Sequence, residues 1–150
     1  MKKKVFGKKL SRDVSARRDL IRSLIKGLVE HGLITTTKQK AKMVRNDIEK
    51  MVVSAKEGSI SSRRRVFSFL GNDRKTTDKL FGVIAKEFKD RKSGFTRIVS
   101  LAERKGDLAQ MVRFEWSQKM AEVEKEKAVS KKAEVEKKKV TKEKTQNKNK

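Results

Sequence analysis

Aromatic side chains stop at Trp116 and other large apolar ones at Met120, and this limit decides how much of the chain can build a core. In residues 119–150 the only apolar residues after Met120 are alanine and valine, set among lysines and glutamates, with no glycine, arginine or aromatic residue. Such a segment cannot bury enough apolar surface to offset the entropy lost on ordering. The sequence therefore predicts one folded region, residues 15–118, followed by a flexible charged tail, residues 119–150.

The whole chain carries a strong excess of positive charge. Lysine and arginine number 42 against 19 acidic residues, which gives a formal net charge of +23. A chain with this charge repels itself unless a polyanion neutralises it, and nucleic acid is the expected partner. No apolar run approaches the roughly 20 residues that span a bilayer, so a spanning segment is excluded. The apolar face of an amphipathic helix from Ser15 could instead meet a membrane surface, but it is better used in the core, and no membrane partner is expected. The first residues lack the apolar stretch of a secretion signal, and a cytoplasmic location is expected.

Apolar residues at helical spacing predict a first helix from Ser15, which Gly32 can end in the left-handed conformation. The basic, aperiodic residues 1–14 before it are expected to form an extended arm. Residues 33–36 are β-branched or apolar and predict a strand, after which Thr37 can cap a second helix.

Two more helices are expected before the end of the domain. Ser61 or Ser62 can cap a third helix that ends before Gly71, and a fourth helix carries the apolar residues between Leu80 and Phe88. Six aromatic residues fall at core spacing and are expected to build the core instead of a base-stacking platform. They are Phe67, Phe69, Phe81, Phe88, Phe114 and Trp116.

Two β-rich runs, residues 95–101 and 108–116, flank a predicted hairpin turn at residues 104–107. Strict alternation is expected to place four side chains on one face: Leu108, Val112, Phe114 and Trp116. The strand at residues 33–36 is expected to join this hairpin. The predicted fold class is α+β, a small three-stranded sheet packed with about four helices, in the order helix, strand, three helices, two strands.

The basic arm and the start of the first helix are the first candidate RNA contacts. Each lysine or arginine can neutralise a phosphate and release condensed counterions. A solvated tail that serves only solubility is the alternative. The candidates are Lys2, Lys3, Lys4, Lys8, Lys9, Arg12, Arg17, Arg18 and Arg22.

A second candidate cluster lies where the second predicted helix begins. Cations are disfavoured there by the helix dipole, and a nearby polyanion would relieve this conflict. Two threonines beside the cluster can donate hydroxyl hydrogen bonds to phosphate or ribose oxygens, or they are only strand formers. The candidates are Thr35, Thr36, Lys38, Lys40, Lys42 and Arg45.

Two further clusters follow. Arg63, Arg64 and Arg65 begin the third predicted helix, and arginine can contact phosphate with two donors or stack on exposed bases. A solvated charged face is the alternative. The last cluster surrounds Gly94, and its arginine in the predicted strand can bind RNA or pair with Glu115 across the hairpin. Its members are Arg91, Lys92, Thr96 and Arg97.

The sequence does not indicate an enzyme. Its aspartates are scattered, without a supporting histidine or a glycine-rich phosphate loop, so no small-molecule substrate and no cofactor is expected. His31 is the only histidine and is expected to be a polar group at a helix end. Cysteine is absent, which leaves neither a disulfide framework nor a thiolate site, and no metal is expected.

Six short strings stand in one order along residues 2–116. They are GKKL from Gly7, ITTT from Ile34, RR from Arg63, KLF from Lys79, GFTRI from Gly94 and GD from Gly106. In this order and spacing they resemble the bacterial large-subunit ribosomal protein seventeen family, because several weak motifs in register are more specific than any one alone.

The resemblance implies an α+β domain on the large ribosomal subunit near the peptide exit, in contact with large-subunit ribosomal RNA and neighbouring ribosomal proteins. Three residues depart from the family pattern: Ala16, Lys8 and Phe95 stand where histidine, arginine and tyrosine are usual. The first change removes a possible phosphate or base contact, and the last removes a possible hydrogen bond.

The predicted function is therefore that of a structural, RNA-binding constituent of the bacterial large ribosomal subunit. The alternative is a DNA-binding or nucleoid-associated basic protein, since the electrostatic attraction does not distinguish DNA from RNA. No helix-turn-helix or zinc finger is recognisable in the sequence, which favours the ribosomal interpretation.

Overall fold

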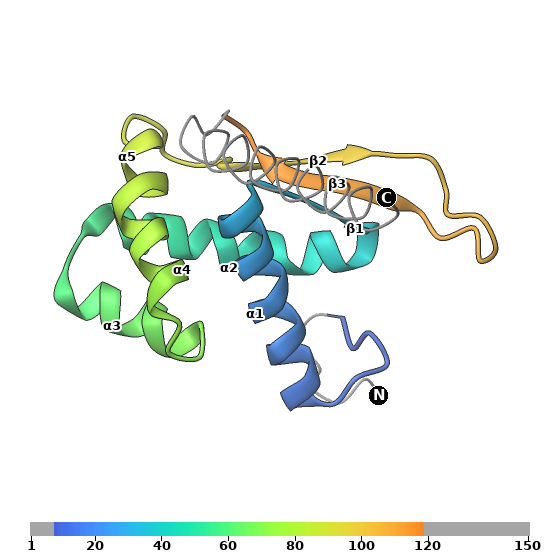
Figure 1. Cartoon of the computed structure of the whole chain (residues 1–150), viewed down its shortest axis with the longest axis horizontal. Coiled ribbons are helices and arrows are strands. Elements are labelled where there is room, and N and C mark those ends of the chain that lie inside the picture. The colour runs from blue at the N-terminus through green and yellow to red at the C-terminus, as the bar shows by residue number, and fades with distance from the viewer. Residues whose placement is uncertain (1–7, 119–150) are drawn as a thin grey trace, which may run out of the picture. The chain divides into compact units, whose positions relative to one another are not determined.

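The computed structural model describes residues 8–118, which form a three-stranded sheet with its helices gathered mainly on one face (Figure 1). The order of elements confirms the predicted α+β arrangement, with α4, η1 and α5 running on as one helix that passes through a wider π-helical segment. The elements are α1 (Val14–His31), β1 (Leu33–Thr37), α2 (Lys38–Glu57), α3 (Ile60–Phe69), α4 (Arg74–Lys79), η1 (Leu80–Ile84), α5 (Ala85–Glu87), β2 (Thr96–Ser100) and β3 (Met111–Trp116).

The last strand of the domain lies in the middle of the sheet. β3 pairs antiparallel with β1 on one side and with β2 on the other, and both Ile34 and Ile98 stand opposite Phe114. β1 thus joins the hairpin as predicted. On the central strand Val112, Phe114 and Trp116 are buried, as the alternation of the sequence predicts.

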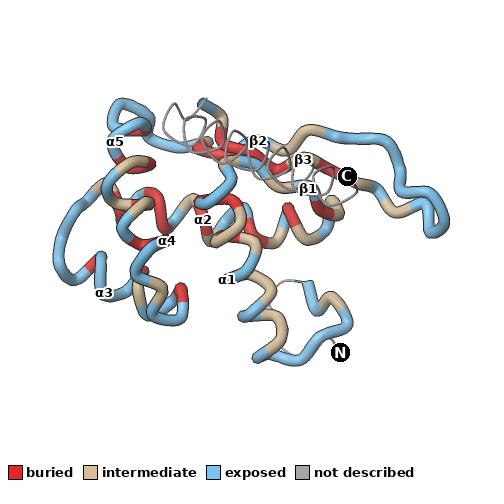
Figure 2. Tube along the Cα trace, viewed as in Figure 1, coloured by how far each residue is buried: buried red, intermediate tan, exposed pale blue. Residues whose placement is uncertain are grey.

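The core forms where α2 crosses the helix-covered face of the sheet (Figure 2). Val44, Ile48 and Val52 of α2 are almost fully buried, at the spacing that puts side chains on one helix face. The ring of Phe88 meets that of Phe95 edge to face, with 5.2 Å between centroids. Burial of such apolar surface supplies most of the stabilisation of a small domain.

Two glycines end helices as the sequence predicts. Gly32 closes α1 at φ 73°, and its N–H donates to the Leu28 carbonyl at 2.8 Å. The same carbonyl accepts the indole N–H of Trp116 at 3.2 Å, which ties the end of α1 to the central strand. Gly58 closes α2 at φ 68°. A left-handed residue at these ends favours glycine, because it has no Cβ.

Three details of the predicted fold are wrong. Leu108 does not join the face of β3, because the chain turns at φ 50° there and the strand begins only at Met111. Phe69 is 36% exposed, so it lies at the margin of the core. The cap of α3 is Ser59, whose side chain accepts from the Ser62 N–H, because Gly58 has just ended the preceding helix.

The structure leaves part of the predicted organisation untested. The tail over residues 119–150 and the first seven residues of the predicted arm, Lys2, Lys3 and Lys4 among them, lie outside the described residues. The division into arm, domain and tail therefore stays a prediction.

Candidate nucleic-acid interface

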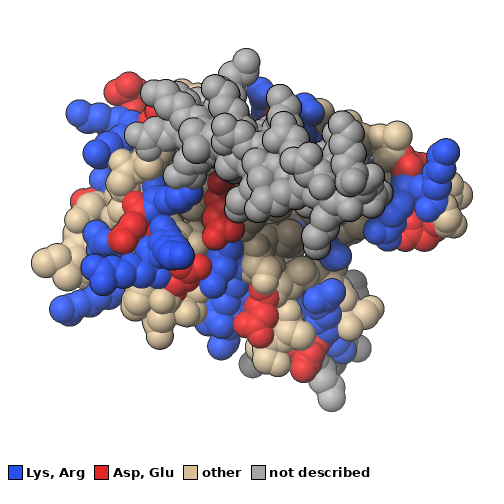
Figure 3. Space-filling model, viewed as in Figure 1, with Lys and Arg blue, Asp and Glu red and all other residues tan. Residues whose placement is uncertain are grey.

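The predicted basic contacts fall into two classes once their neighbours are known. Four of them meet an acidic side chain of the same chain, and these pairs concentrate away from the start of α2. The pairs are Arg22 with Asp19, Arg63 with Asp78, Arg65 with Glu57 and Arg97 with Glu115. In the view of Figure 3 the basic side chains over the left-hand side of the molecule, where α3 and α4 lie, are interspersed with acidic ones.

Arg97 illustrates the paired class. Its Nε lies 2.6 Å from Oε1 of Glu115, across the β2–β3 pairing, so the pairing that the sequence left open is present. Nε of Arg113 lies 2.9 Å from the other carboxylate oxygen. One carboxylate is thus shared by two guanidinium groups, and Arg97 keeps only part of its charge for an external partner.

The three consecutive arginines of α3 do not act alike. Arg63 binds Asp78 and also sits 5.7 Å from the ring centroid of Phe81, so it joins α3 to the following helix. Arg65 lies 3.9 Å from Glu57, and both groups are largely exposed, so this pair contributes little to stability. Arg64 makes no hydrogen bond or ion pair within residues 8–118.

The unpaired class gathers at two places in the described chain. Of the predicted contacts that make no ion pair within residues 8–118, most precede the middle of α1 or belong to the first turns of α2, whereas the exposed side chains of Lys75, Lys86, Lys89 and Lys105, which also make none in that range, lie elsewhere. The unpaired predicted contacts are Lys8, Lys9, Arg12, Arg18, Lys40, Lys42, Arg45 and, elsewhere, Arg64 and Lys92. Three more predicted contacts bind only neutral oxygen atoms: Arg17 donates to the Arg12 carbonyl, Lys38 to Gln110 Oε1 and Arg91 to Ser117 Oγ.

The start of α2 concentrates this positive charge. Lys38, Lys42 and Arg45 follow one another at intervals of four and three residues, so they share one helix face, with Lys40 on another flank. The first turn contains no acidic residue, and the capping residue Thr37 makes no side-chain hydrogen bond to the helix. Within the part of the chain that the structure describes, the positive end of the helix dipole and these cations therefore meet without a counter-charge.

Glu49, farther along the same face of α2, is a structural residue that the sequence did not reveal. Its Oε2 accepts the N–H groups of Gly94 at 3.1 Å and Phe95 at 3.3 Å. Its Oε1 accepts the N–H of Thr96 at 3.4 Å and the hydroxyl of Thr96 at 3.2 Å. The carboxylate thereby fixes the loop that carries Arg91 and Lys92 into β2. An acid 45 residues away in sequence gives no local signal of this role.

Two of the predicted threonine contacts are turned inward. Thr96 is 4% exposed and its hydroxyl is held by Glu49, while Thr36 is 8% exposed on the helix-covered face of the sheet. Both side chains are buried, so they are the least accessible of the predicted contacts. Thr35, its side chain pointing to the other face, is exposed.

The later lysine and arginine residues of α1 are less available to an external partner, because they bind groups of the same chain. Asp73 pairs with Lys26 at 3.1 Å and accepts from Thr76 at the start of α4. The hydrogen bond from the Lys26 side chain is the main cause of the lowered pKa of Asp73. The hydrogen bonds that Asp73 accepts from Thr76 lower this pKa further. Arg22 donates to the Phe69 carbonyl at 2.7 Å, so it holds α1 against the end of α3.

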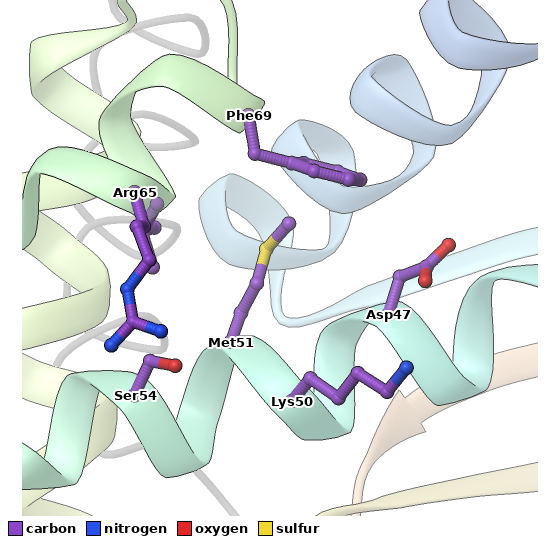
Figure 4. Close-up of a pocket in the computed structure, with 7 residues that line it drawn as sticks. Asp47, Lys50, Met51, Ser54, Arg65 and Phe69 are labelled. Atoms are coloured by element: carbon purple, nitrogen blue, oxygen red, sulfur yellow. The ribbon is translucent and has the colours of Figure 1, made fainter. Parts of the chain in front are cut away.

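A recess of about 160 Å³ between α2 and α3 is the other feature of note (Figure 4). Its floor is apolar, with Met51, Val66 and Phe69, and its rim carries Asp47. Burial raises the pKa of Asp47, while the charge of nearby Lys50 acts in the opposite sense. The lining contains no pair of carboxylates and no histidine, so it does not supply an acid and a base for catalysis.

The described residues offer no metal or membrane chemistry of the usual kind. Within residues 8–118, no three histidine, cysteine, aspartate or glutamate side chains are grouped to hold a metal ion. In the same range no helix combines the length and the apolar character needed to cross a bilayer. His31 is the last residue of α1 and is exposed, as expected for a polar group at a helix end.

Known proteins resemble this chain over most of the folded region. Residues 20–117, from α1 to just past β3, match the family model described as Ribosomal protein L17. A relative from Desulfotalea psychrophila (strain LSv54 / DSM 12343), the "Large ribosomal subunit protein bL17", is 41% identical over 115 residues. That similarity covers 77% of this chain and 88% of the relative.

Proposed function

The chain belongs to the ribosomal protein L17 family, and from this premise we propose that its unpaired basic side chains bind the RNA of the large ribosomal subunit. As a family member it is a structural constituent of the bacterial large subunit, acts in translation in the cytoplasm, and is not an enzyme. The alternative of a DNA-binding or nucleoid-associated protein is not favoured by this membership.

The observation that carries the proposal is that unpaired cations cluster before the middle of α1 and at the start of α2; Lys75, Lys86 and Lys89 are also unpaired within residues 8–118 but belong to neither cluster. A cation that already meets a carboxylate gains little from a phosphate, whereas an unpaired cation releases condensed counterions when it binds one. The proposed principal contacts are the unpaired or neutrally bonded side chains Lys8, Lys9, Arg12, Arg17, Arg18, Lys38, Lys40, Lys42, Arg45, Arg64, Arg91 and Lys92, with Thr35 beside them.

The proposal ranks the remaining candidates. Arg22, Arg63, Arg65 and Arg97 are weaker contacts, because their internal partners hold them in place. Lys2, Lys3 and Lys4 belong to the same proposed arm and lie outside the described residues. We further propose, as the family resemblance implies, that the protein lies near the peptide exit beside other proteins of the subunit.

Sedimentation tests the proposal directly. The tagged full-length chain is expected to sediment with the large subunit in a sucrose gradient at low and at moderate salt. Replacing Lys40, Lys42 and Arg45 by glutamine is expected to move a large share of the chain to the top at moderate salt. The matched control removes three exposed charges elsewhere, Lys75→Gln, Lys86→Gln and Lys89→Gln, and is expected to stay with the subunit.

Two results would contradict this function. Wild-type chain that remains at the top of the gradient, or that follows chromosomal DNA, excludes a place on the subunit. If both triple variants lose sedimentation with the large subunit to the same extent, overall charge determines binding, and not the cluster at the start of α2.

A further inference from the structure

The loop between β2 and β3, residues 101–110, extends beyond the sheet and exposes two leucines (Figure 1). Leu108 is 71% exposed and Leu101 is 40% exposed. Single exposed apolar side chains are common, and Ile60 at the start of α3 is 73% exposed, but Leu101 and Leu108 belong to one projecting loop, and exposed apolar side chains that are grouped are a feature of interaction sites.

Internal hydrogen bonds tie this loop together. The Arg104 N–H donates to the Ala109 carbonyl, and the Leu108 N–H donates back to the Arg104 carbonyl, both at 3.0 Å. The Arg104 guanidinium binds both carboxylate oxygens of Asp107, with 3.0 Å between Nε and Oδ1. The hydrogen bonding from the Arg104 side chain is the main reason that the pKa of the Asp107 carboxyl group is lowered to about 2. The loop is thus held in one shape while it is exposed.

The fixed shape presents Leu108 outward at a backbone angle that leucine rarely adopts. Its φ is 50°, in the left-handed region that asparagine and glycine tolerate better. Neither backbone preference nor solubility therefore favours leucine at this position of the free chain. A partner that covers the side chain would account for it.

The charge of the loop indicates what kind of partner this is. Its two basic and two acidic side chains cancel, in a chain with a net charge of +23, and the charges stand side by side at the right-hand end of Figure 3. Arg104 is bound to Asp107, which leaves Lys105 as the one cation of this loop without a partner within residues 8–118. Phosphate binding relies on excess positive charge, whereas the centre of a protein interface is apolar and poor in charge.

We propose that this loop docks on a neighbouring protein of the large subunit, with Leu108 seated in an apolar recess of that protein and Leu101 beside it. The inference rests on the proposed function, because the partner is another protein of the same particle. Since the loop is already ordered, little further conformational entropy is lost on docking. The Lys38 N–H donates to the Gln110 carbonyl and its ammonium donates to Gln110 Oε1, so the last residue of the docking loop is bound to the first residue of the proposed RNA-binding cluster of α2.

The test uses full-length chain and large subunits from which this protein has been washed out with salt. Leu108→Asn removes the apolar side chain at an angle that asparagine accepts, and Lys105→Gln removes the free charge. We expect Leu108→Asn to raise the Kd for these subunits about tenfold or more, on the scale of a lost leucine contact, and to leave thermal stability unchanged or higher. Lys105→Gln is expected to change the Kd less than about twofold, as for a charge at the rim of an interface.

A photo-crosslinking residue at position 108 identifies what the loop touches. A crosslink to a protein of the subunit, together with the loss of affinity in Leu108→Asn, supports the inference. A crosslink to ribosomal RNA, or normal binding by Leu108→Asn, overturns it while the proposed function stands. Wild-type chain that fails to rebind the washed subunits overturns the proposed function and this inference with it.

Discussion

The two halves of α2 carry charged side chains on the same face but employ them differently. In the first half Lys42 and Arg45 have no partner within residues 8–118. In the second half Glu49 holds the loop around Gly94, and Lys56 donates to the Arg91 carbonyl. The difference shows that the charge count of a helix does not identify a binding surface. Only the charges that the chain leaves without a partner can be assigned to an external one.

The largest effect is expected at Glu49. Glu49→Ala removes the acceptor of four hydrogen bonds and leaves the Gly94, Phe95 and Thr96 N–H groups without it. Since hydrogen bonds to a charged group contribute about 1.5–3 kcal/mol each and are not additive, the free energy of unfolding should fall by about 3 kcal/mol. Urea unfolding measures this change. Glu30→Gln, at an exposed position of α1, is the control and should change it by less than about 0.5 kcal/mol.

If Glu49→Ala lowers the free energy of unfolding as little as Glu30→Gln does, Glu49 is an ordinary surface acid. The contrast between the two halves of α2 would then disappear.

The first half of α2 should respond in binding and not in stability. Replacing Lys42 and Arg45 by glutamine removes two proposed phosphate contacts. The slope of log K against log salt for large-subunit RNA should become shallower by about 1.8 on the scale for a duplex. The free energy of unfolding should change little, because neither side chain has a partner within residues 8–118. A salt titration of RNA binding checks the slope, and an unchanged slope would remove these residues from the interface.

Arg63 should show the opposite pattern. Arg63→Gln breaks the ion pair with Asp78 and the contact with the Phe81 ring. Both the ion pair and the ring contact are partly exposed, so the free energy of unfolding is expected to fall by about 1 kcal/mol. The salt slope of RNA binding should move by well under one unit. If this variant loses RNA affinity as the α2 double variant does, pairing within the chain is not what separates the two classes of cation.

The smallest effect concerns the pH dependence of the loop between β2 and β3. The bond to Arg104 lowers the pKa of Asp107 from 3.8 to about 2. A carboxyl group whose pKa is lowered in the folded state stabilises that state above the unfolded pKa, and this contribution is lost as the pH falls through the folded pKa. The Arg104–Asp107 tie should therefore persist at neutral pH and disappear between about pH 4 and pH 2. NMR titration of the Asp107 carboxyl carbon measures this midpoint, and a value near 3.8 would show that the tie is absent in solution.

The sequence predicted the framework because its signals are local. Helical spacing, the glycines at positions 32 and 58 and the strict alternation over β3 each act within a few residues, and the element order is confirmed. The error at Leu108 is also local, but it arises from hydrogen bonds within the loop that the alternation of apolar residues does not signal. The strand does not reach Leu108, because the backbone is bound across the loop between Arg104 and Ala109.

The candidate interface could be predicted only in outline. Composition and the helix dipole pointed to the start of α2, where the cations are indeed unpaired in the described chain. The partners of Arg63 and Arg97 lie 15 and 18 residues away, and Glu49 acts over 45 residues or more. The hairpin register offered Glu115 as an alternative partner for Arg97, but no spacing rule joins Arg63 to Asp78 or Glu49 to Gly94, so the sequence could not separate all the available charges from those bound within the fold.

Lysine acylation of intact large subunits tests the central claim most directly. Reactivity at each lysine is compared between the free full-length chain and the assembled subunit, before and after ribonuclease digestion. We predict that Lys40 and Lys42 are protected severalfold in the subunit, that digestion restores their reactivity, and that exposed Lys75 stays reactive throughout. Full reactivity of Lys40 and Lys42 in the intact subunit, or protection that survives removal of the RNA, would contradict the assignment of the unpaired cations to RNA.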